Sequence, residues 1–209
     1  GERLFATAFK ADYHTVETVA HAEAAMHYLP GTTFILDIGG QDMKAISVSQ
    51  DIVTGITLNE ACSAGCGSFL ESFARSLEIP VTEIADRAFR AKNPSRLGSR
   101  CTVFMNSSII TEQKNGKGPD DIMAGLCRSI IENVFTKVVR VPNMRSLGER
   151  VVLQGGTFKN DAVLRAFEQY TGIAGVRAPY PGEMGAIGIA LLTKRHMEGG
   201  RVTNFPGFG

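Results

Sequence analysis

Three apolar, β-branched runs follow one another closely in the first third of the chain and restrict the folds it can adopt. The runs are TTFILDI, MKAISVS and DIVTGITL, and together they occupy residues 32–58. A glycine pair at 39–40 separates the first two runs, and a Ser-Gln pair at 49–50 separates the last two, so the pattern predicts two consecutive β-hairpins. Helical periodicity dominates the rest of the chain, with short apolar stretches between the helices. The sequence therefore predicts an α/β fold in which helices flank a mixed sheet.

Capping residues and periodicity predict the positions of the helices. Ser68 stands three residues before Glu71, which is the pattern of a capping box, so we expect a helix from about Ser68 to 79–80. The segment RVVLQGG at 150–156 reads as a buried strand. Further helices are expected over 81–91, about 106–114, from 119 onward, over 160–170 and over 181–196, with a short strand at 174–178.

Length, composition and charge exclude several classes of protein. The chain has 209 residues, of which 44% are hydrophobic, so it can bury a real core. Lysine and arginine number 22 against 21 acidic residues, without long runs of one charge, so we expect neither a nucleic-acid partner nor a membrane partner. Neither a signal peptide nor a spanning segment is recognisable, which favours a cytoplasmic protein. The first residue, Gly1, indicates a piece of a longer polypeptide, with residues 1–198 as one folded unit and 199–209 as a linker-like tail.

Four cysteines, at positions 62, 66, 101 and 127, occur in a chain without secretory signals. This usage argues against a disulfide scaffold and for metal, redox or packing roles. Cys127 lies on one face of a helical pattern with Met123 and Ile131, so we expect it in the core. The histidines show no metal-type pairing with the cysteines, so a structural zinc site is not expected.

The segment ILDIGGQD joins an apolar strand to a double-glycine turn. Asp37 ends the strand, and Gly39 and Gly40 form the turn. Backbone amides without side-chain cover would face outward beside a carboxylate, which suits a phosphate oxygen and its Mg²⁺. A plain hairpin with a glycine turn explains the same residues equally well.

A second glycine pair follows the same plan. VVLQGGTFKND places Gly155 and Gly156 between a strand and the start of a helix, where the missing Cβ atoms would let a flat ring lie against the backbone. Two such clusters in one α/β chain indicate a nucleotide held between them.

Five segments together resemble one family. FILDIGGQDMKAI, NEACSAGCGSFLESFA, SRCTVFMNSSII, VVLQGGTFKNDAVLRAFE and EMGAIGIALL occur in the order found in the BadF/BadG/BcrA/BcrD-type ATPases. These proteins are ATP-dependent activators of 2-hydroxyacyl-CoA dehydratases and related reductases. The resemblance extends from about Glu17 onward and implies the actin, hexokinase and Hsp70 ATPase fold, in which two ribonuclease-H-like halves clamp ATP. This chain resembles the second, C-terminal half, and CSAGCG resembles the large multidomain branch.

The resemblance also implies roles for individual residues. Asp37 would lie nearest Mg²⁺ or its water, and Gln41 would lie near the γ-phosphate, as the two catalytic positions. The other residues implied to bind ATP or ADP are Gly39, Gly40, Asp42, Gly155, Gly156 and Asn160.

Cys62 and Cys101 fall where the resembled activators place their cluster cysteines. Two cysteines from each subunit of a homodimer would hold one [4Fe-4S] cluster, because such a cluster takes four thiolates. At Cys66 the dehydratase activators more often have threonine. Its role stays open between a thiol near the cluster, a variant ligand and a small residue at a helix entry.

Three functions remain compatible with these patterns. The first is an ATP-driven electron-transfer activator with a dehydratase or reductase as its partner, and the alternatives are a small-molecule kinase of the same superfamily and a non-catalytic regulatory half. The first phosphate loop of the family is absent from these residues, so we expect this piece alone to be inactive.

His21 is either an ordinary helix residue or a contact at the seam between the two halves. Small residues at 185, 186, 188 and 190 predict close helix packing.

Overall fold

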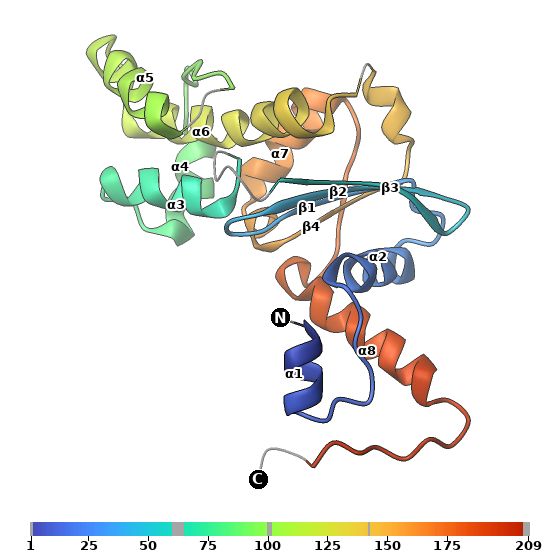
Figure 1. The fold of residues 1–209 in the computed structure, drawn as a ribbon. Helices are drawn as coiled ribbons and strands as arrows, with labels where there is room; N and C mark the ends of the chain where they lie inside the picture. Colours follow the sequence, from blue (N-terminus) through green and yellow to red (C-terminus); the bar gives the residue numbers. More distant parts are fainter. Residues whose placement is uncertain (1, 60–64, 100–101, 142, 207–209) are drawn as a thin grey trace.

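The structure is a computed structural model that describes residues 2–59, 65–99, 102–141 and 143–206. Five strands form one sheet in the order β3-β2-β1-β4-β5 (Figure 1). They are β1 (Phe34–Ile38), β2 (Met43–Ser49), β3 (Ile52–Asn59), β4 (Val151–Gln154) and β5 (Val176–Arg177). β1 pairs antiparallel with β2, and β2 pairs antiparallel with β3, which confirms the two predicted hairpins. β4 pairs parallel with both β1 and β5.

This topology confirms the predicted fold class. A three-stranded antiparallel meander extended by parallel strands is the ribonuclease-H-like half of the actin, hexokinase and Hsp70 ATPase fold. The parallel strands are joined through helices, as parallel strands require. The helices are α1 (Glu2–Ala8), α2 (Glu17–Tyr28), α3 (Gly67–Ser76), α4 (Ile84–Phe89), α5 (Thr102–Lys114), α6 (Pro119–Asn133), α7 (Asp161–Thr171) and α8 (Met184–Met197). Shorter helical turns are η1 (Val81–Glu83), η2 (Val134–Val139), η3 (Met144–Leu147), η4 (Gly156–Lys159) and η5 (Pro181–Glu183).

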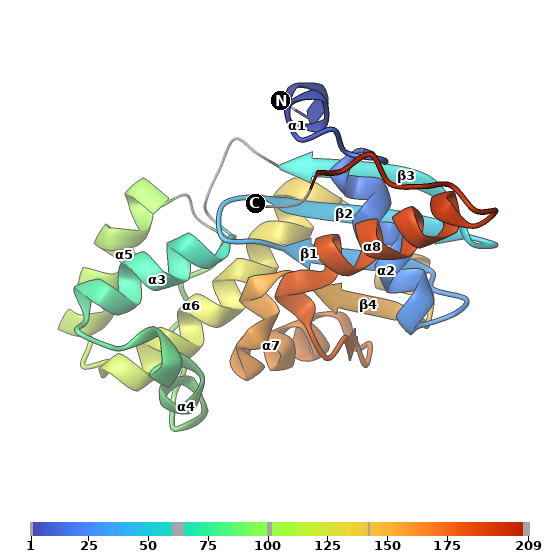
Figure 2. The same ribbon diagram turned by 90° about the horizontal axis from the view of Figure 1, so that it is seen from below.

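Helices cover both faces of the sheet. Side chains alternate along β1, so this strand contributes apolar residues to the core on each face. Phe34, Leu36 and Ile38 point into a large core shared with α3, α4, α6 and α7. Ile35 points to the opposite face, into a smaller core with α2 and α8. Figure 2 shows α2 and α8 lying together across this second face, while α3, α4 and α5 lie to one side of the sheet.

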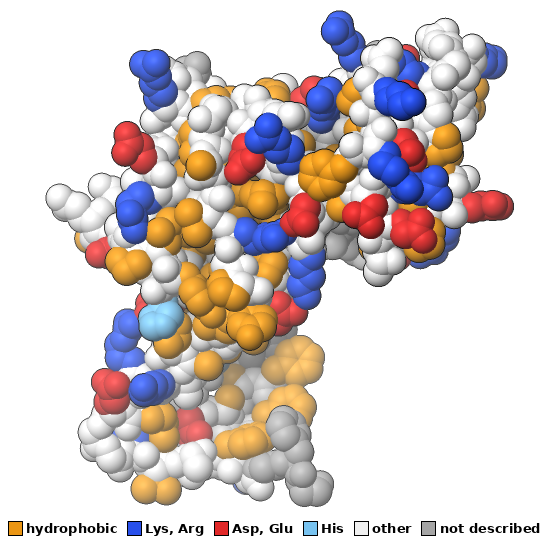
Figure 3. Space-filling view, turned by 180° about the vertical axis from the view of Figure 1, so that it is seen from behind, with side chains coloured by type: hydrophobic (Ala, Val, Ile, Leu, Met, Phe, Trp, Pro, Cys, Tyr) orange, Lys and Arg blue, Asp and Glu red, His pale blue; other side chains and the backbone are white. Residues whose placement is uncertain are grey.

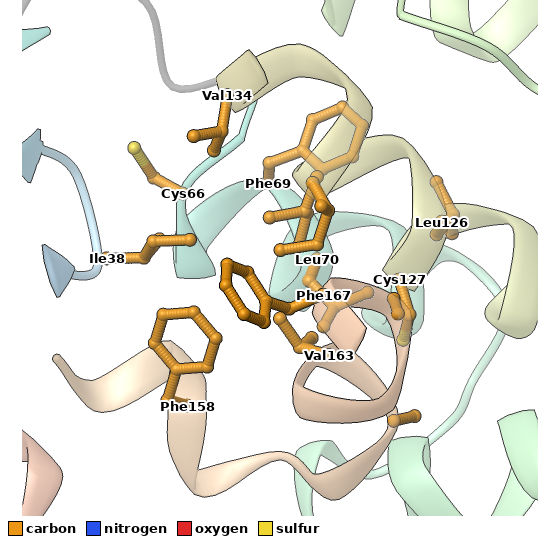
Figure 4. Close-up of a cluster of buried hydrophobic side chains, with 14 of the residues drawn as sticks. Ile38, Cys66, Phe69, Leu70, Leu126, Cys127, Val134, Phe158, Val163 and Phe167 are labelled. Carbon is orange, nitrogen blue, oxygen red and sulfur yellow. The ribbon is translucent and has the colours of Figure 1, made fainter. Parts of the chain in front are cut away.

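The large core contains both described cysteines (Figure 4). Cys66 lies near Ile38 and Val134, and Cys127 lies near Val163. Burial raises the pKa of the Cys127 thiol to about 12, so this cysteine stays protonated at neutral pH. The predicted core position of Cys127 is confirmed.

The start of α3 differs from the predicted capping box. The helix begins at Gly67, and its N-cap is Cys66 rather than Ser68. The amides of Gly67 and Ser68 donate to the carbonyl oxygens of Gly39 and Gly40, at 2.9 and 2.7 Å. A neighbouring loop therefore satisfies the amides that a capping side chain would otherwise satisfy.

Other helix boundaries also shift. α3 ends at Ser76, before the predicted 79–80, and the segment predicted as one helix over 81–91 divides into η1 and α4. α5 begins at Thr102, a turn earlier than predicted. The helix expected over 160–170 is confirmed as α7, which ends at Gly172 in the left-handed conformation that glycine favours. The short strand at 174–178 is confirmed as β5.

The molecular surface shows no segregation of charge on the face seen in Figure 3, where basic and acidic side chains are interspersed. None of the helices within the described ranges is both long enough and apolar enough to cross a lipid bilayer.

α2 and α8 pack closely because α8 presents glycines to its neighbour. A Cβ atom on Gly188 would overlap the carbonyl oxygen of Ala20, and one on Gly185 would lie 2.6 Å from Nε2 of His21. The predicted packing role is confirmed for Gly185 and Gly188, whereas Ala186 and Ala190 are exposed.

Gly188→Ala should therefore lower the free energy of unfolding by about 2 kcal/mol or more, because the added methyl must push α8 away from α2. Denaturant unfolding followed by circular dichroism measures the change. The matched control is Gly118→Ala, since an added Cβ there meets nothing within 4 Å. Equal stability of the two variants would contradict the close contact.

Candidate functional site

A pocket of about 620 Å³ lies where the two glycine pairs come together. This volume falls in the range of small-molecule sites. Residues of the first glycine turn, of α3, of η1 and α4, and of the second glycine turn form its walls. They are Gly40, Gln41, Gly67, Ser68, Leu70, Glu71, Val81, Thr82, Ile84, Ala85, Gly156, Thr157, Lys159 and Asn160.

The two glycine turns and α3 are joined by direct contacts. Thr157 donates its hydroxyl to the carbonyl oxygen of Gly39 at 2.9 Å, which links the second turn to the first. Gly67 lies against the same contact, since a Cβ there would be 2.7 Å from Oγ1 of Thr157. The pocket is therefore built from segments far apart in the sequence, and its geometry depends on their mutual hydrogen bonds.

In the part of the chain that the structure describes, the turn that follows β1 places two backbone amides without a backbone hydrogen-bond partner beside the pocket. Gly39 donates to the carbonyl oxygen of Asp42 at 2.9 Å, which closes the turn. Within the described ranges, no backbone hydrogen bond outside regular elements uses the amides of Gly40 and Gln41. An added Cβ at Gly40 would meet nothing within 4 Å, so the backbone there is uncovered. An exposed pair of amides at a glycine turn fits a phosphate group.

The second turn offers an equally uncovered surface. Gly155 has a positive φ of +91°, and a Cβ there would meet Oδ1 of Asp37 at 2.7 Å, so only glycine suits this position. Gly156, the next residue, has open space where a Cβ would be, which leaves room for a ring against the backbone. Both glycine turns therefore leave open space in a pocket large enough for a nucleotide.

Asn160 has a structural task beside the pocket. Its Oδ1 accepts hydrogen bonds from the amides of Ala162 and Val163, at 2.9 and 3.4 Å, and so caps the N-terminus of α7. Because it also lines the pocket, its amide group can face a ligand while its oxygen caps the helix.

Lys159 is a pocket residue that the sequence analysis missed. Its ammonium lies 2.7 Å from Oε1 of Glu183, and this hydrogen bond lowers the pKa of the Glu183 carboxyl. Ser68, Glu71 and Thr82 were missed as well. The sequence carried no signal for them, because α3 and η1 reach the pocket only through tertiary packing.

Asp37 does not line the pocket. The alternation along β1 turns its side chain to the α2 face, where the residue is only 2% exposed. Nε2 of Gln154 donates to Oδ2 of Asp37 at 2.9 Å, and Nδ1 of His21 donates to the same oxygen. Sequence reasoning placed Asp37 beside the phosphate turn and missed both donors.

His21 lies between two carboxylates. Its Nε2 is 3.2 Å from Oε1 of Glu17, one helical turn earlier, and its Nδ1 faces Asp37. Burial alone would lower the pKa of His21, but the hydrogen bond and the negative charge of Asp37 raise it above its ordinary value. His21 therefore makes specific contacts beyond those of an ordinary helix residue.

Asp42, at the far end of the turn, is held by a buried lysine. Nζ of Lys44 lies 2.5 Å from Oδ2 of Asp42 and 3.2 Å from Oε1 of Glu17. Burial opposes the charged form of Lys44, but the hydrogen bond to Asp42 and the nearby carboxylates raise its pKa above its ordinary value. Gln41 stands exposed between these anchored ends and lines the pocket.

Cys62 and Cys101, the predicted cluster ligands, lie outside the described residues. The described part of the chain contains no group of three or more histidine, cysteine and acidic side chains that could hold a metal ion. Cys66 is buried at the entry to α3. The ligand set for an iron-sulfur cluster is therefore still a prediction.

Comparisons with known proteins agree with this architecture. The (R)-2-hydroxyglutaryl-CoA dehydratase activating ATPase of Acidaminococcus fermentans is 34% identical over 181 residues, which are 87% of this chain and 68% of that protein. The crystal structure of the Acidaminococcus fermentans (R)-2-hydroxyglutaryl-CoA dehydratase component A has a TM-score of 0.82 and 33% identity, and the match covers 91% of this chain and 71% of that one.

A second solved structure is that of the activator of the 2-hydroxyisocaproyl-CoA dehydratase from Clostridium difficile with bound ADPNP. Its TM-score is 0.79 and its identity is 28%, and the match covers 92% of this chain and 72% of that chain. The profile of the BadF/BadG/BcrA/BcrD ATPase family matches residues 1–193. Since this match spans nearly the whole chain, the protein belongs to the BadF/BadG/BcrA/BcrD ATPase family.

Proposed function

We propose that this chain forms the ATP-binding half of an iron-sulfur activator, which couples ATP hydrolysis to low-potential electron transfer to a dehydratase or reductase partner. Relatives that are 34 and 28% identical are named as a dehydratase activating ATPase and a dehydratase activator, and the latter holds ADPNP. The observation that carries the proposal is the pocket of nucleotide size between the two glycine turns, which Gly40, Gln41 and Gly156 line.

Different residues of this chain have different roles in the proposed site. Bound Mg-ATP supplies the phosphoryl group that is cleaved and the charge that the protein must accommodate. The amides of Gly40 and Gln41 donate to phosphate oxygens, and the Gln41 side chain orients the attacking water. Asp37 contributes a carboxylate beside the two turns, and Gly155 and Gly156 accept the adenosine.

Two contacts of Asn133 support the assignment of the cluster ligands. A Cβ on Gly65, three residues after Cys62, would lie 3.5 Å from Cβ of Asn133. Ser99, two residues before Cys101, donates its hydroxyl to Oδ1 of Asn133 at 3.0 Å. Gly65 and Ser99, each close in sequence to one of the two cysteines, thus approach the same residue of α6. A homodimer then supplies four thiolates to one [4Fe-4S] cluster.

Replacing Asp37 with asparagine keeps the shape of the buried side chain and removes its charge. We expect Asp37→Asn to lower the rate of ATP hydrolysis by the native protein by about a hundredfold, because the carboxylate that orients Mg²⁺ or its water is lost. Phosphate release measured over a range of Mg²⁺ concentrations tests this. Asp51→Asn, in the exposed β2–β3 turn, is the control, and equal turnover in both variants would overturn the role of Asp37.

Gly156→Val should weaken Mg-ADP binding by about tenfold or more, because the added side chain occupies the space proposed for the adenosine. Its melting temperature should stay close to that of the unaltered protein, since a Cβ at this position meets nothing within 4 Å. Calorimetric titration and thermal unfolding measure the two quantities. Gly118→Val, outside the pocket, should bind Mg-ADP normally, and normal binding by Gly156→Val would exclude this pocket as the adenosine site.

The cysteines can be separated by anaerobic reconstitution of the native protein with iron and sulfide. Cys62→Ser and Cys101→Ser should each lose the bound iron and the visible absorbance of the cluster, since serine is a far poorer iron ligand than thiolate. Cys66→Ser should keep most of both, because Cys66 is buried in the core.

Retention of the cluster by Cys62→Ser would remove the iron-sulfur assignment. If cysteine variants also transferred phosphate from ATP to a small molecule at an unaltered rate, the kinase alternative would replace the activator.

A further inference from the structure

Three buried polar side chains form a row across the middle of the sheet. Lys44 on β2, Asp37 on β1 and Gln154 on β4 are direct neighbours in the strand register. They are 5, 2 and 0% exposed, on the face that α2 covers. Polar groups are costly to bury in a sheet, so this row needs a compensating role or compensating partners.

Two donors, one from α2 and one from this row, converge on one atom of Asp37. Nδ1 of His21 and Nε2 of Gln154 both contact Oδ2 of Asp37, from the helix side and from the neighbouring strand. The other oxygen, Oδ1, faces Gly155, where a Cβ would lie only 2.7 Å away. One carboxylate oxygen is therefore held by two donors, and the second lies beside Gly155 of the second glycine turn.

The side-chain amide of Gln154 donates to Asp37, but among the described residues its carbonyl oxygen is left without a hydrogen bond. Its Oε1 is buried and has no hydrogen-bond partner within the described ranges. A buried carbonyl without a partner costs free energy, and an apolar residue of similar size would avoid that cost. The position of the amide is explained if its donor is needed at Asp37.

The imidazole ring of His21 is held by contacts on several sides. Glu17 contacts its Nε2 from the same helix, and Gly185 on α8 leaves room for the ring only because it has no Cβ. The ring is 13% exposed, and the remaining charged neighbour on the sheet is Lys44. Its orientation is thus set from α2, α8 and the sheet together.

We propose that His21 and Gln154 are positioning residues, which fix the carboxylate of Asp37 so that Oδ1 stays beside Gly155, at the second glycine turn. The inference rests on the proposed function, because it assigns their effect to Asp37. Neither residue lines the pocket, and both contact Asp37.

Two amide substitutions at position 21 distinguish positioning from packing. The asparagine amide nitrogen can occupy the place of the histidine Nδ1, whereas the glutamine amide reaches the place of Nε2. We expect His21→Gln to lower kcat for ATP hydrolysis by about a hundredfold, since the donor to Asp37 is lost. His21→Asn should lose about tenfold or less, because a donor remains. Gln154→Met should also lower kcat by about tenfold or more, as a second and independent removal of a donor to Asp37.

KM for Mg-ATP and the calorimetric Kd for Mg-ADP should stay within about threefold in these variants, because the residues that line the pocket are unchanged. His27→Gln, on the exposed side of α2, is the matched control and should retain normal kcat.

A second readout needs no nucleotide. In the free protein, the Nδ1–H proton of His21 should give a low-field NMR signal because it donates to a carboxylate. Asp37→Asn should shift this signal upfield, and His27→Gln should leave it unchanged. A His21 ring without a protected Nδ1–H would overturn the inference.

The outcomes also separate this inference from the proposed function. If Asp37→Asn lowers kcat but His21→Gln does not, Asp37 is needed and the positioning role is wrong. If His21→Asn and His21→Gln lose kcat equally and lose equal thermal stability, His21 serves packing only, and the inference fails. If Asp37→Asn itself hydrolyses ATP normally, the proposed role of Asp37 fails first.

Discussion

The buried carboxylate of Asp37 is the constraint on which much of the structure depends. An ionised group in a sheet interior costs several kcal/mol unless charges and donors surround it. His21 and Gln154 supply the donors, and Lys44 on the adjacent strand supplies a positive charge nearby. These partners come from α2, β2 and β4, so the carboxylate of Asp37 links three elements to β1. Glu17 is largely exposed and adds little, because water screens its charge.

The same strand also organises the opposite face. β1 ends in the turn whose carbonyl groups at Gly39 and Gly40 cap α3, and Thr157 joins that turn to the second glycine pair. Loop and helix therefore stabilise one another, since the unpaired amides of α3 meet the unpaired carbonyls of the turn. The polar row lies on the α2 face of the sheet, and the pocket is lined by residues that follow β1 and β4 and by α3.

The proposed roles separate residues that bind the nucleotide from residues that orient a catalytic group. Gln41 lines the pocket and can contact a ligand directly. In the proposal, Asp37 acts through Oδ1, which lies beside Gly155, so its effect depends on how well its side chain is held. Membership of the BadF/BadG/BcrA/BcrD ATPase family places this geometry in proteins that use ATP. The close contact of α2 with α8, which needs Gly185 and Gly188, keeps the supporting helix fixed against the sheet.

Local sequence determined the strands, the turns and most helices, because apolar periodicity and glycine act over a few residues. It also identified both glycine pairs, and hence the two turns of the pocket. Tertiary structure alone decided which face of β1 carries Asp37 and brought His21 to it. It also replaced Ser68 with a neighbouring loop as the cap of α3. Such contacts join residues 16 to 117 positions apart, and no local pattern encodes them, because they arise only when distant elements pack together.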